Sequence, residues 1–199
     1  GRIVPLRWDG KGFTAGERFP HDTNIPPLSN GVPGLSAARF DKEWRLIYTD
    51  EKSRLQILDE GGKSRYKSQD LYGTGLDYFE WGEYESLDAR RPPYHLRKAV
   101  RVAPGGGEFP LVLIPEVQKG MLDIVQGFYD STRLVLLQWD GGEFEEKTGS
   151  KSSSHFFSGA DFLSPSGLKR GDTVVASAIE QIGSAWKEKI SRLLLYRLE

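Results

Sequence analysis

The three histidines are the side chains best suited to metal binding or general-base chemistry, and they lie far apart in the sequence. No two of His21, His95 and His155 lie within 50 residues of each other, whereas a zinc site needs clustered His and acidic ligands. A hydrolase site would need His155 to meet a distant serine and a carboxylate, without the Gly-x-Ser-x-Gly turn that carries the nucleophile in many hydrolases. The pattern favours a flexible turn over residues 152–154 and leaves an ester-active hydrolase as an alternative.

Two further segments carry residue types used in catalysis or phosphate binding. Glu143, Glu145 and Glu146 could supply the paired carboxylates of a glycosidase. Acids so close together on an exposed hairpin are ordinary surface chemistry, so a carbohydrate-active hydrolase is again an alternative. Residues 105–107 are all glycine but are flanked by prolines, so no helix N-terminus follows to receive a phosphate. The sequence predicts a loop there.

Aromatic side chains gather between residues 66 and 84, interleaved with glycines. Rigid amphipathic rings form good recognition surfaces, so this cluster is a candidate sugar- or partner-binding loop. The alternative is that the rings pack between sheets. The candidate binding residues are Tyr72, Tyr78, Phe79, Trp81 and Tyr84.

The elements that must position these residues are bounded first by composition. The 199 residues include no cysteine, which removes disulfide scaffolds, thiolate zinc sites and cysteine nucleophiles. Lys and Arg number 27 and Asp and Glu 28, for a net charge of −1, whereas a dedicated nucleic-acid binder usually carries a basic excess. No stretch approaches the ~18–20 apolar residues of a membrane span. The length fits a single domain over 1–199.

Short β-branched and aromatic runs separated by Asp-Gly turns predict an all-β protein. Residues 3–8, 9–12 and Phe13 read as strand, tight turn and strand, because Asp-Gly supplies the positive φ angles of hairpin turns. Residues 134–144 repeat that arrangement, and residues 55–63 form a looser copy without the tryptophan. The sequence therefore predicts antiparallel hairpins in three places.

A degenerate repeat underlies this pattern. Three short segments align with one another: Ser53-Arg-Leu-Gln-Ile-Leu58, Ser131-Thr-Arg-Leu-Val-Leu-Leu137 and Ser191-Arg-Leu-Leu-Leu-Tyr196. A related block precedes each of them, starting at residues 38, 100 and 160. A four-stranded unit recurring about every 60 residues is typical of the radially repeated sheets of a β-propeller. We therefore expect about three four-stranded antiparallel sheets in an incomplete ring. The approximate repeats are 1–36 (partial), 37–98, 99–158 and 159–199.

The C-terminal segment allows two interpretations. Ile182, Trp186 and Ile190 fall at near-helical spacing, which predicts a broken amphipathic helix. The repeat register instead predicts a strand over 173–179, a connection over 180–189 and a final strand over 193–198. We prefer the register interpretation.

Four short motifs follow one another along the chain. They are Ala38-Arg-Phe-Asp41, the strand leading into Asp59-Glu-Gly-Gly-Lys63, Leu136-Leu-Gln-Trp-Asp-Gly-Gly-Glu-Phe144 and Arg192-Leu-Leu-Leu-Tyr-Arg-Leu198. The order resembles the C-terminal part of the FG-GAP/VCBS-type repeat propellers of bacterial envelope proteins. The resemblance implies a non-catalytic binding or scaffolding module of the periplasm or cell envelope, acting through loops at one rim. The composition is equally compatible with the cytosol.

The resemblance also bears on metals and partners. That family carries an Asp-x-Asp-x-Asp-Gly calcium loop, but the matching stretches here hold too few carboxylates for the six to eight oxygen ligands of calcium. We expect no cofactor and no metal; Asp161 and Asp172 are the residual calcium candidates. A calcium-stabilised adhesion module is the third functional alternative and predicts a calcium-dependent melting shift. Expected partners are a protein or a glycan, with the ring completed by further blades of a longer chain or by a second copy.

Overall fold

The computed structural model describes residues 4, 6–16, 35–40, 42–50, 52–73, 78–80, 93–95, 100–104, 109–119, 129–163, 168–181 and 189–198. Every strand pair in this part of the chain is antiparallel, and no helix occurs in it. The predicted all-β fold class is therefore confirmed.

The described strands, in chain order, are β1 (Leu6–Trp8), β2 (Phe13–Ala15), β3 (Leu35–Phe40), β4 (Glu43–Thr49), β5 (Arg54–Leu58), β6 (Ser64–Leu71), β7 (Tyr78–Glu80), β8 (Pro93–His95), β9 (Arg101–Ala103), β10 (Leu111–Lys119), β11 (Tyr129–Trp139), β12 (Phe144–Gly149), β13 (Phe156–Phe162), β14 (Thr173–Gln181) and β15 (Lys189–Arg197). The first sheet has the order β3-β4-β5-β6, the second β9-β10-β11-β12 and the third β13-β14-β15. The pair β1–β2, here called the N-terminal hairpin, and the pair β7–β8 form two-stranded sheets.

Short turns led by aspartate join several of the consecutive strands, namely β1–β2, β4–β5, β5–β6 and β11–β12. After β4, the Asp50 carboxylate accepts hydrogen bonds from the N–H groups of Lys52 and Arg54, each at 2.9 Å. After β11, the Asp140 carboxylate accepts two N–H groups of its own turn at 2.8 Å. An aspartate at the start of a turn favours this geometry because its side chain satisfies N–H groups that the ladder leaves free.

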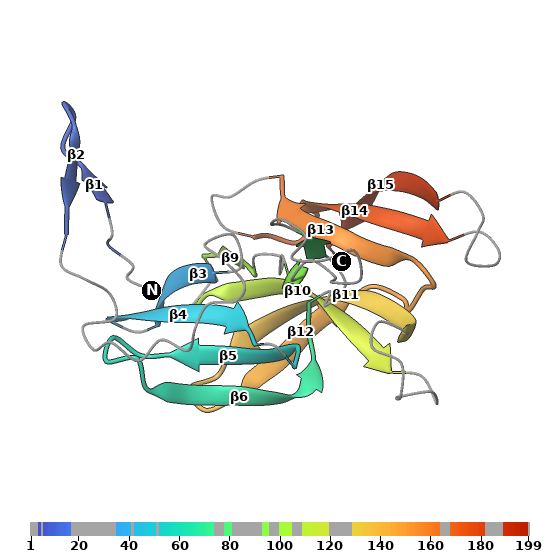
Figure 1. The fold of residues 1–199 in the computed structure, drawn as a ribbon, viewed down its shortest axis with the longest axis horizontal. Coiled ribbons are helices and arrows are strands. Elements are labelled where there is room, and N and C mark those ends of the chain that lie inside the picture. Colours follow the sequence, from blue (N-terminus) through green and yellow to red (C-terminus); the bar gives the residue numbers. More distant parts are fainter. Residues whose placement is uncertain are drawn as a thin grey trace, which may run out of the picture.

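The three larger sheets stack face to face, with the second between the other two (Figure 1). Alternate residues of a strand point to opposite faces of a sheet. On β11, Val135 and Leu137 pack in the core shared with the first sheet, whereas Leu134 and Leu136 pack against the third sheet. The second sheet is therefore buried on both faces, which explains the nearly continuous apolar run of its central strands.

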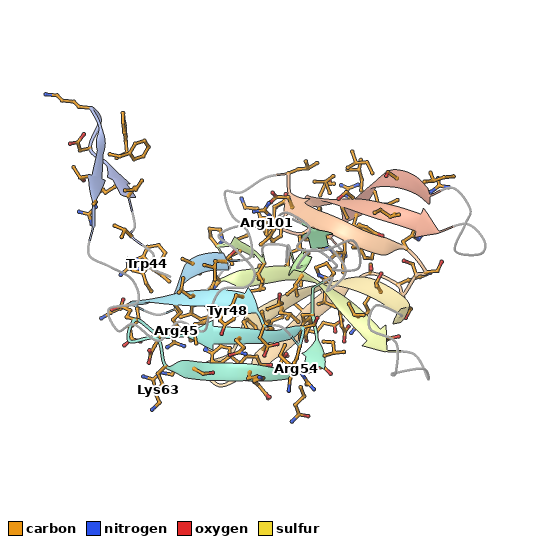
Figure 2. The ribbon with its side chains drawn as sticks, viewed as in Figure 1. Trp44, Arg45, Tyr48, Arg54, Lys63 and Arg101 are labelled. Atoms are coloured by element: carbon orange, nitrogen blue, oxygen red, sulfur yellow. The ribbon has the colours of Figure 1, made fainter. Side chains whose placement is uncertain are left out.

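The first strands of the three sheets lie next to one another. Ser36 on β3 donates a hydrogen bond to the Val100 carbonyl just before β9. Arg101 on β9, labelled in Figure 2, forms an ion pair with Asp161 on β13 at 3.3 Å. Polar contacts thus tie each sheet to the next along these strands, beside the apolar contacts of their faces.

The C-terminal segment is two strands, as the repeat register predicted. β14 and β15 pair along their full lengths, from Thr173 opposite Arg197 to Gln181 opposite Lys189. The helical interpretation is wrong for these residues. β14 ends at Gln181 rather than at 179, and β15 begins at Lys189 rather than at 193 and ends at Arg197 rather than at 198. Ile182 and Trp186, on which the helical spacing rested, lie outside the described residues. β14 and β15 carry apolar side chains on both faces of the sheet, which removes the simple alternation that marks a strand.

Candidate docking surface

The aromatic cluster predicted from the sequence divides into described and undescribed parts. Tyr72 is 6% exposed and belongs to the core between the first and second sheets, and its burial raises its pKa well above the usual value. Tyr78 and Phe79 lie on β7, paired with β8. Trp81 and Tyr84 lie outside the described residues. The ring of Tyr72 takes part in packing between sheets, and binding by the other four residues stays a prediction.

The two residual calcium candidates have separate partners. Asp161 pairs with Arg101, and the Asp172 carboxylate accepts the Lys169 N–H at 2.7 Å. Asp161 lies opposite Val175 in the register. Val175 is three residues along the chain from Asp172, so the two aspartates are offset by about 10 Å along the strands at ~3.3 Å per residue. Within the described residues, no group of three or more His, Asp or Glu side chains could hold a metal ion.

Two of the three acids considered for glycosidase chemistry are engaged by basic side chains. Glu145 accepts a hydrogen bond from the Lys147 ammonium at 2.5 Å, and Glu146 receives both Nη atoms of Arg133 at 2.8 and 2.7 Å. A pocket of about 80 Å³ opens between the second and third sheets, but small-molecule sites usually hold ~300–1,000 Å³. Neither feature favours a small-molecule active site.

The third sheet exposes an apolar face on the side away from the second sheet. Leu194 and Tyr196 on β15 pack toward the second sheet, so Leu193 and Leu195 point away from it. These two side chains, here called the outer leucines, are 72% and 66% exposed. Val175 on β14 pairs with Leu195 and extends the face. We call this surface the outer face.

The outer leucines occupy positions that are buried in the other two sheets. In each sheet the third strand carries the repeated Ser-Arg-Leu or Ser-Thr-Arg-Leu motif, and the leucine and the residue two positions later face the next sheet. In the first sheet these are Leu55 and Ile57, both 0% exposed; in the second they are Leu134 and Leu136, 3% and 6% exposed. The outer face of the third sheet is thus equivalent to the face with which the first sheet packs on the second and the face with which the second packs on the third.

The N-terminal hairpin presents a second exposed apolar face. Trp8 and Phe13 are paired across the two strands, with ring centroids 5.0 Å apart. Trp8 is 57% exposed, Phe13 69% and Leu6 64%. The hairpin stands apart from the stacked sheets in Figure 1, so its rings cover each other on one side only.

This hairpin has the same construction as the β11–β12 hairpin. There, Trp139 and Phe144 pair across the turn with centroids 5.2 Å apart. In both turns the leading aspartate, Asp9 or Asp140, accepts two backbone N–H groups, and these hydrogen bonds lower its pKa. Trp139 is only 3% exposed, because it packs edge-on against Phe40 of the first sheet.

Exposed apolar side chains concentrate in the two parts of the chain that carry these faces. Apart from Trp44 at the start of β4 (Figure 2), the large apolar side chains that are strongly exposed among the described residues belong to the N-terminal segment or to the third sheet. They are Val4, Leu6, Trp8, Phe13, Leu163, Ile190, Leu193 and Leu195.

Sequence reasoning identified the strand that carries the outer leucines but did not select them as functional residues. The available signal was the alignment of the three Ser-Arg-Leu motifs, which makes these leucines equivalent to residues facing a neighbouring sheet. The alignment alone does not reveal that they are exposed, because exposure depends on which sheet covers them in the fold.

Comparisons with known proteins give no relative for this chain. No protein-family model, characterised protein or solved structure matches it. The described residues include no helix with the length and apolarity needed to cross a membrane.

Proposed function

We propose that this protein is a non-catalytic binding or scaffolding module made of propeller-like sheets, and that the outer face of the third sheet is its contact surface for a further β-sheet. The observation that carries the proposal is the contrast between equivalent leucines. Leu134 is 3% exposed in the second sheet, whereas Leu193 is 72% exposed in the third. Apolar faces of this kind mark protein interaction sites.

The edge of the third sheet supports the same function. In the first and second sheets a fourth strand pairs with the third, but among the described residues β15 has β14 as its only partner. An unpaired edge offers a row of backbone donors and acceptors to an added strand. A partner that is itself a sheet could therefore contact both the side chains of the face and the backbone of the edge.

The motif order that resembles FG-GAP/VCBS-type repeats also supports a scaffolding function. Proteins of that kind stack four-stranded sheets around an axis, so a sheet with one uncovered face fits a module that is completed by a partner. The same resemblance favours the periplasm or cell envelope as the compartment.

The first test asks whether the outer leucines serve folding or contact. At low concentration, the free energy of unfolding of the double variant Leu193→Asp/Leu195→Asp should lie within about 0.5 kcal/mol of that of the unmodified chain, because only exposed positions change. The matched variant Leu134→Ala should lower the free energy of unfolding by about 2–5 kcal/mol, because this equivalent leucine is buried. Chemical denaturation followed by circular dichroism measures both. Unfolding of the aspartate variant would show that the leucines serve the fold and would overturn the proposal.

The second test asks whether the face is available. An apolar fluorescent dye such as ANS should bind the unmodified chain at low concentration and give a weaker signal with Leu193→Asp/Leu195→Asp, the remaining signal coming from the N-terminal hairpin. Trp44→Asp is the control, because Trp44 is 50% exposed but lies outside both apolar faces. Equal dye signals from the double variant and the unmodified chain would mean that the outer face is not an open contact surface.

A further inference from the structure

We propose that the N-terminal hairpin of a second copy of this chain occupies the outer face, so that copies assemble head to tail. This inference rests on the proposed function of the outer face and names its partner. The observation that carries it is that the chain exposes a Trp–Phe hairpin and a leucine-bearing sheet face, and that it buries one example of each in the same core between its own sheets.

The buried version of this contact lies between the first and second sheets. The Trp139 ring meets Phe40 at 6.1 Å and Tyr66 at 5.3 Å, both nearly perpendicular to it. The same core contains Leu55 and Ile57 from the third strand of the first sheet. A Trp–Phe hairpin therefore packs on the preceding sheet, on the face that carries the repeated leucine motif.

The two kinds of element found in this core, a Trp–Phe hairpin and a leucine motif on a sheet face, recur near opposite ends of the chain with their apolar side chains exposed. Trp8 and Phe13 reproduce the aromatic pair, its cross-strand register and its Asp-led turn, but are 57% and 69% exposed. Leu193 and Leu195 reproduce the leucine motif face but are 72% and 66% exposed. Placing the hairpin of one copy on the outer face of another would bring together the same two kinds of element that share a core inside the chain.

The hairpin also needs a partner for its own stability. A two-stranded hairpin with no further packing is marginally stable in water. β1 and β2 make their main contacts only with each other among the described strands, and the apolar side chains of Trp8, Phe13 and Leu6 share an uncovered face. Burial of that face against a leucine-rich sheet would supply the missing packing.

The two faces differ, which determines the type of assembly. A contact between unlike surfaces is heterologous, and it repeats from copy to copy until a ring closes or a filament forms. We therefore expect species larger than a dimer as the concentration rises, rather than a symmetric dimer that stops at two chains.

The test uses two variants that each remove one half of the contact. Trp8→Asp/Phe13→Asp removes the hairpin face, Leu193→Asp/Leu195→Asp removes the outer face, and Trp44→Asp is the control. Light scattering coupled to size-exclusion chromatography, supported by sedimentation velocity, measures mass against concentration. The unmodified chain and the control should grow beyond the 22.4 kDa monomer as concentration increases, and each double variant should stay monomeric.

Mixing the two double variants provides the decisive measurement. One keeps an intact outer face and the other an intact hairpin, so an equimolar mixture should form a two-chain complex and nothing larger. Formation of that complex also shows that both variants are folded. A mixture that stays monomeric overturns the proposal.

Three further results would contradict it. Association of the hairpin variant at unmodified strength would mean that outer faces or β15 edges pair with themselves. An unmodified chain that stays monomeric at high concentration would exclude a second copy. A shift in tryptophan fluorescence when the outer leucines are changed in the monomer, absent when Trp8 is also replaced by Phe, would place the hairpin on the outer face of its own chain. The first two leave the dye and stability tests of the outer face intact, so failure of this inference is distinguishable from failure of the proposed function. The third would also cover the outer face in the monomer, and the weakened dye signal of the unmodified chain would identify it.

Discussion

At the scale of single residues, a partly buried aspartate, Asp50, holds the β4–β5 turn of the first sheet in place. Both carboxylate oxygens of Asp50 are used: one accepts the N–H groups of Lys52 and Arg54, and the other accepts the Gln56 amide at 2.6 Å and the Lys67 ammonium at 2.8 Å. Burial acts to raise the pKa of Asp50, but these hydrogen bonds together hold the pKa below its ordinary value. The turn therefore depends on an ionised aspartate.

Replacing this carboxylate should make stability less dependent on acid. Because the folded pKa is lowered, the stabilisation by Asp50 is fully present above the unfolded pKa of about 3.9 and is lost as pH falls through the folded value. Asp50→Asn should lower the free energy of unfolding by about 1–3 kcal/mol near neutral pH, because the NH₂ group of the new amide would face hydrogen-bond donors. The difference should shrink as pH falls below about 4. Urea denaturation across that range measures it, with the exposed Asp70→Asn on β6 as the control; a cost that stays constant with pH would contradict this prediction.

At the scale of elements, the repeated Asp-led turn sets the register that brings each Trp–Phe pair together. In the β11–β12 turn, Gly141 has a φ of +109°, whereas Gly142 has no positive φ and has space for a Cβ atom, 3.8 Å from Asp140 Oδ1. The turn therefore requires glycine at the first of two adjacent glycines only. This requirement follows from the backbone, since a Cβ at Gly141 would meet no other atom within 4 Å.

These adjacent glycines form a matched pair of variants. Gly141→Ala should lower the free energy of unfolding by about 1–3 kcal/mol, because a side chain at that φ is strained. Gly142→Ala should change it by less than about 0.5 kcal/mol, as most surface substitutions do. Chemical denaturation measures both. Equal effects would show that the turn is not held at the observed backbone angles.

The sequence predicted the elements better than their surroundings, and particular residues show why. Asp140-Gly141 and the alternation in β11 are local signals, so the hairpin could be predicted from adjacent residues. The aromatic candidate Tyr72 is instead buried, and Leu193 exposed, because burial depends on the sheet that covers a residue. Single-sequence reasoning contains no information on that distant contact.

At the scale of the whole molecule, the order of the stack determines where stability concentrates. The second sheet is covered on both faces, so Val135 and Leu136 on β11 are 1% and 6% exposed even though they point in opposite directions. The third sheet is covered on one face by the second, and the N-terminal hairpin contributes to none of the core clusters. Local opening requires least free energy where few apolar contacts must break. The N-terminal hairpin and the third sheet should therefore open before the second sheet does.

Hydrogen exchange measured by mass spectrometry should reveal this gradient and its dependence on concentration. At low concentration, amides of β10 and β11 should exchange slowest, those of β15 faster, and those of the N-terminal hairpin fastest, because an isolated hairpin is marginally stable. At high concentration, head-to-tail contact should slow exchange in both the hairpin and β15 while leaving β10 and β11 unchanged. Leu193→Asp/Leu195→Asp should abolish that slowing in both segments together. Slowing confined to β15 would show that a partner covers the outer face without the hairpin, and strong protection of the hairpin at low concentration would show that the monomer already packs it.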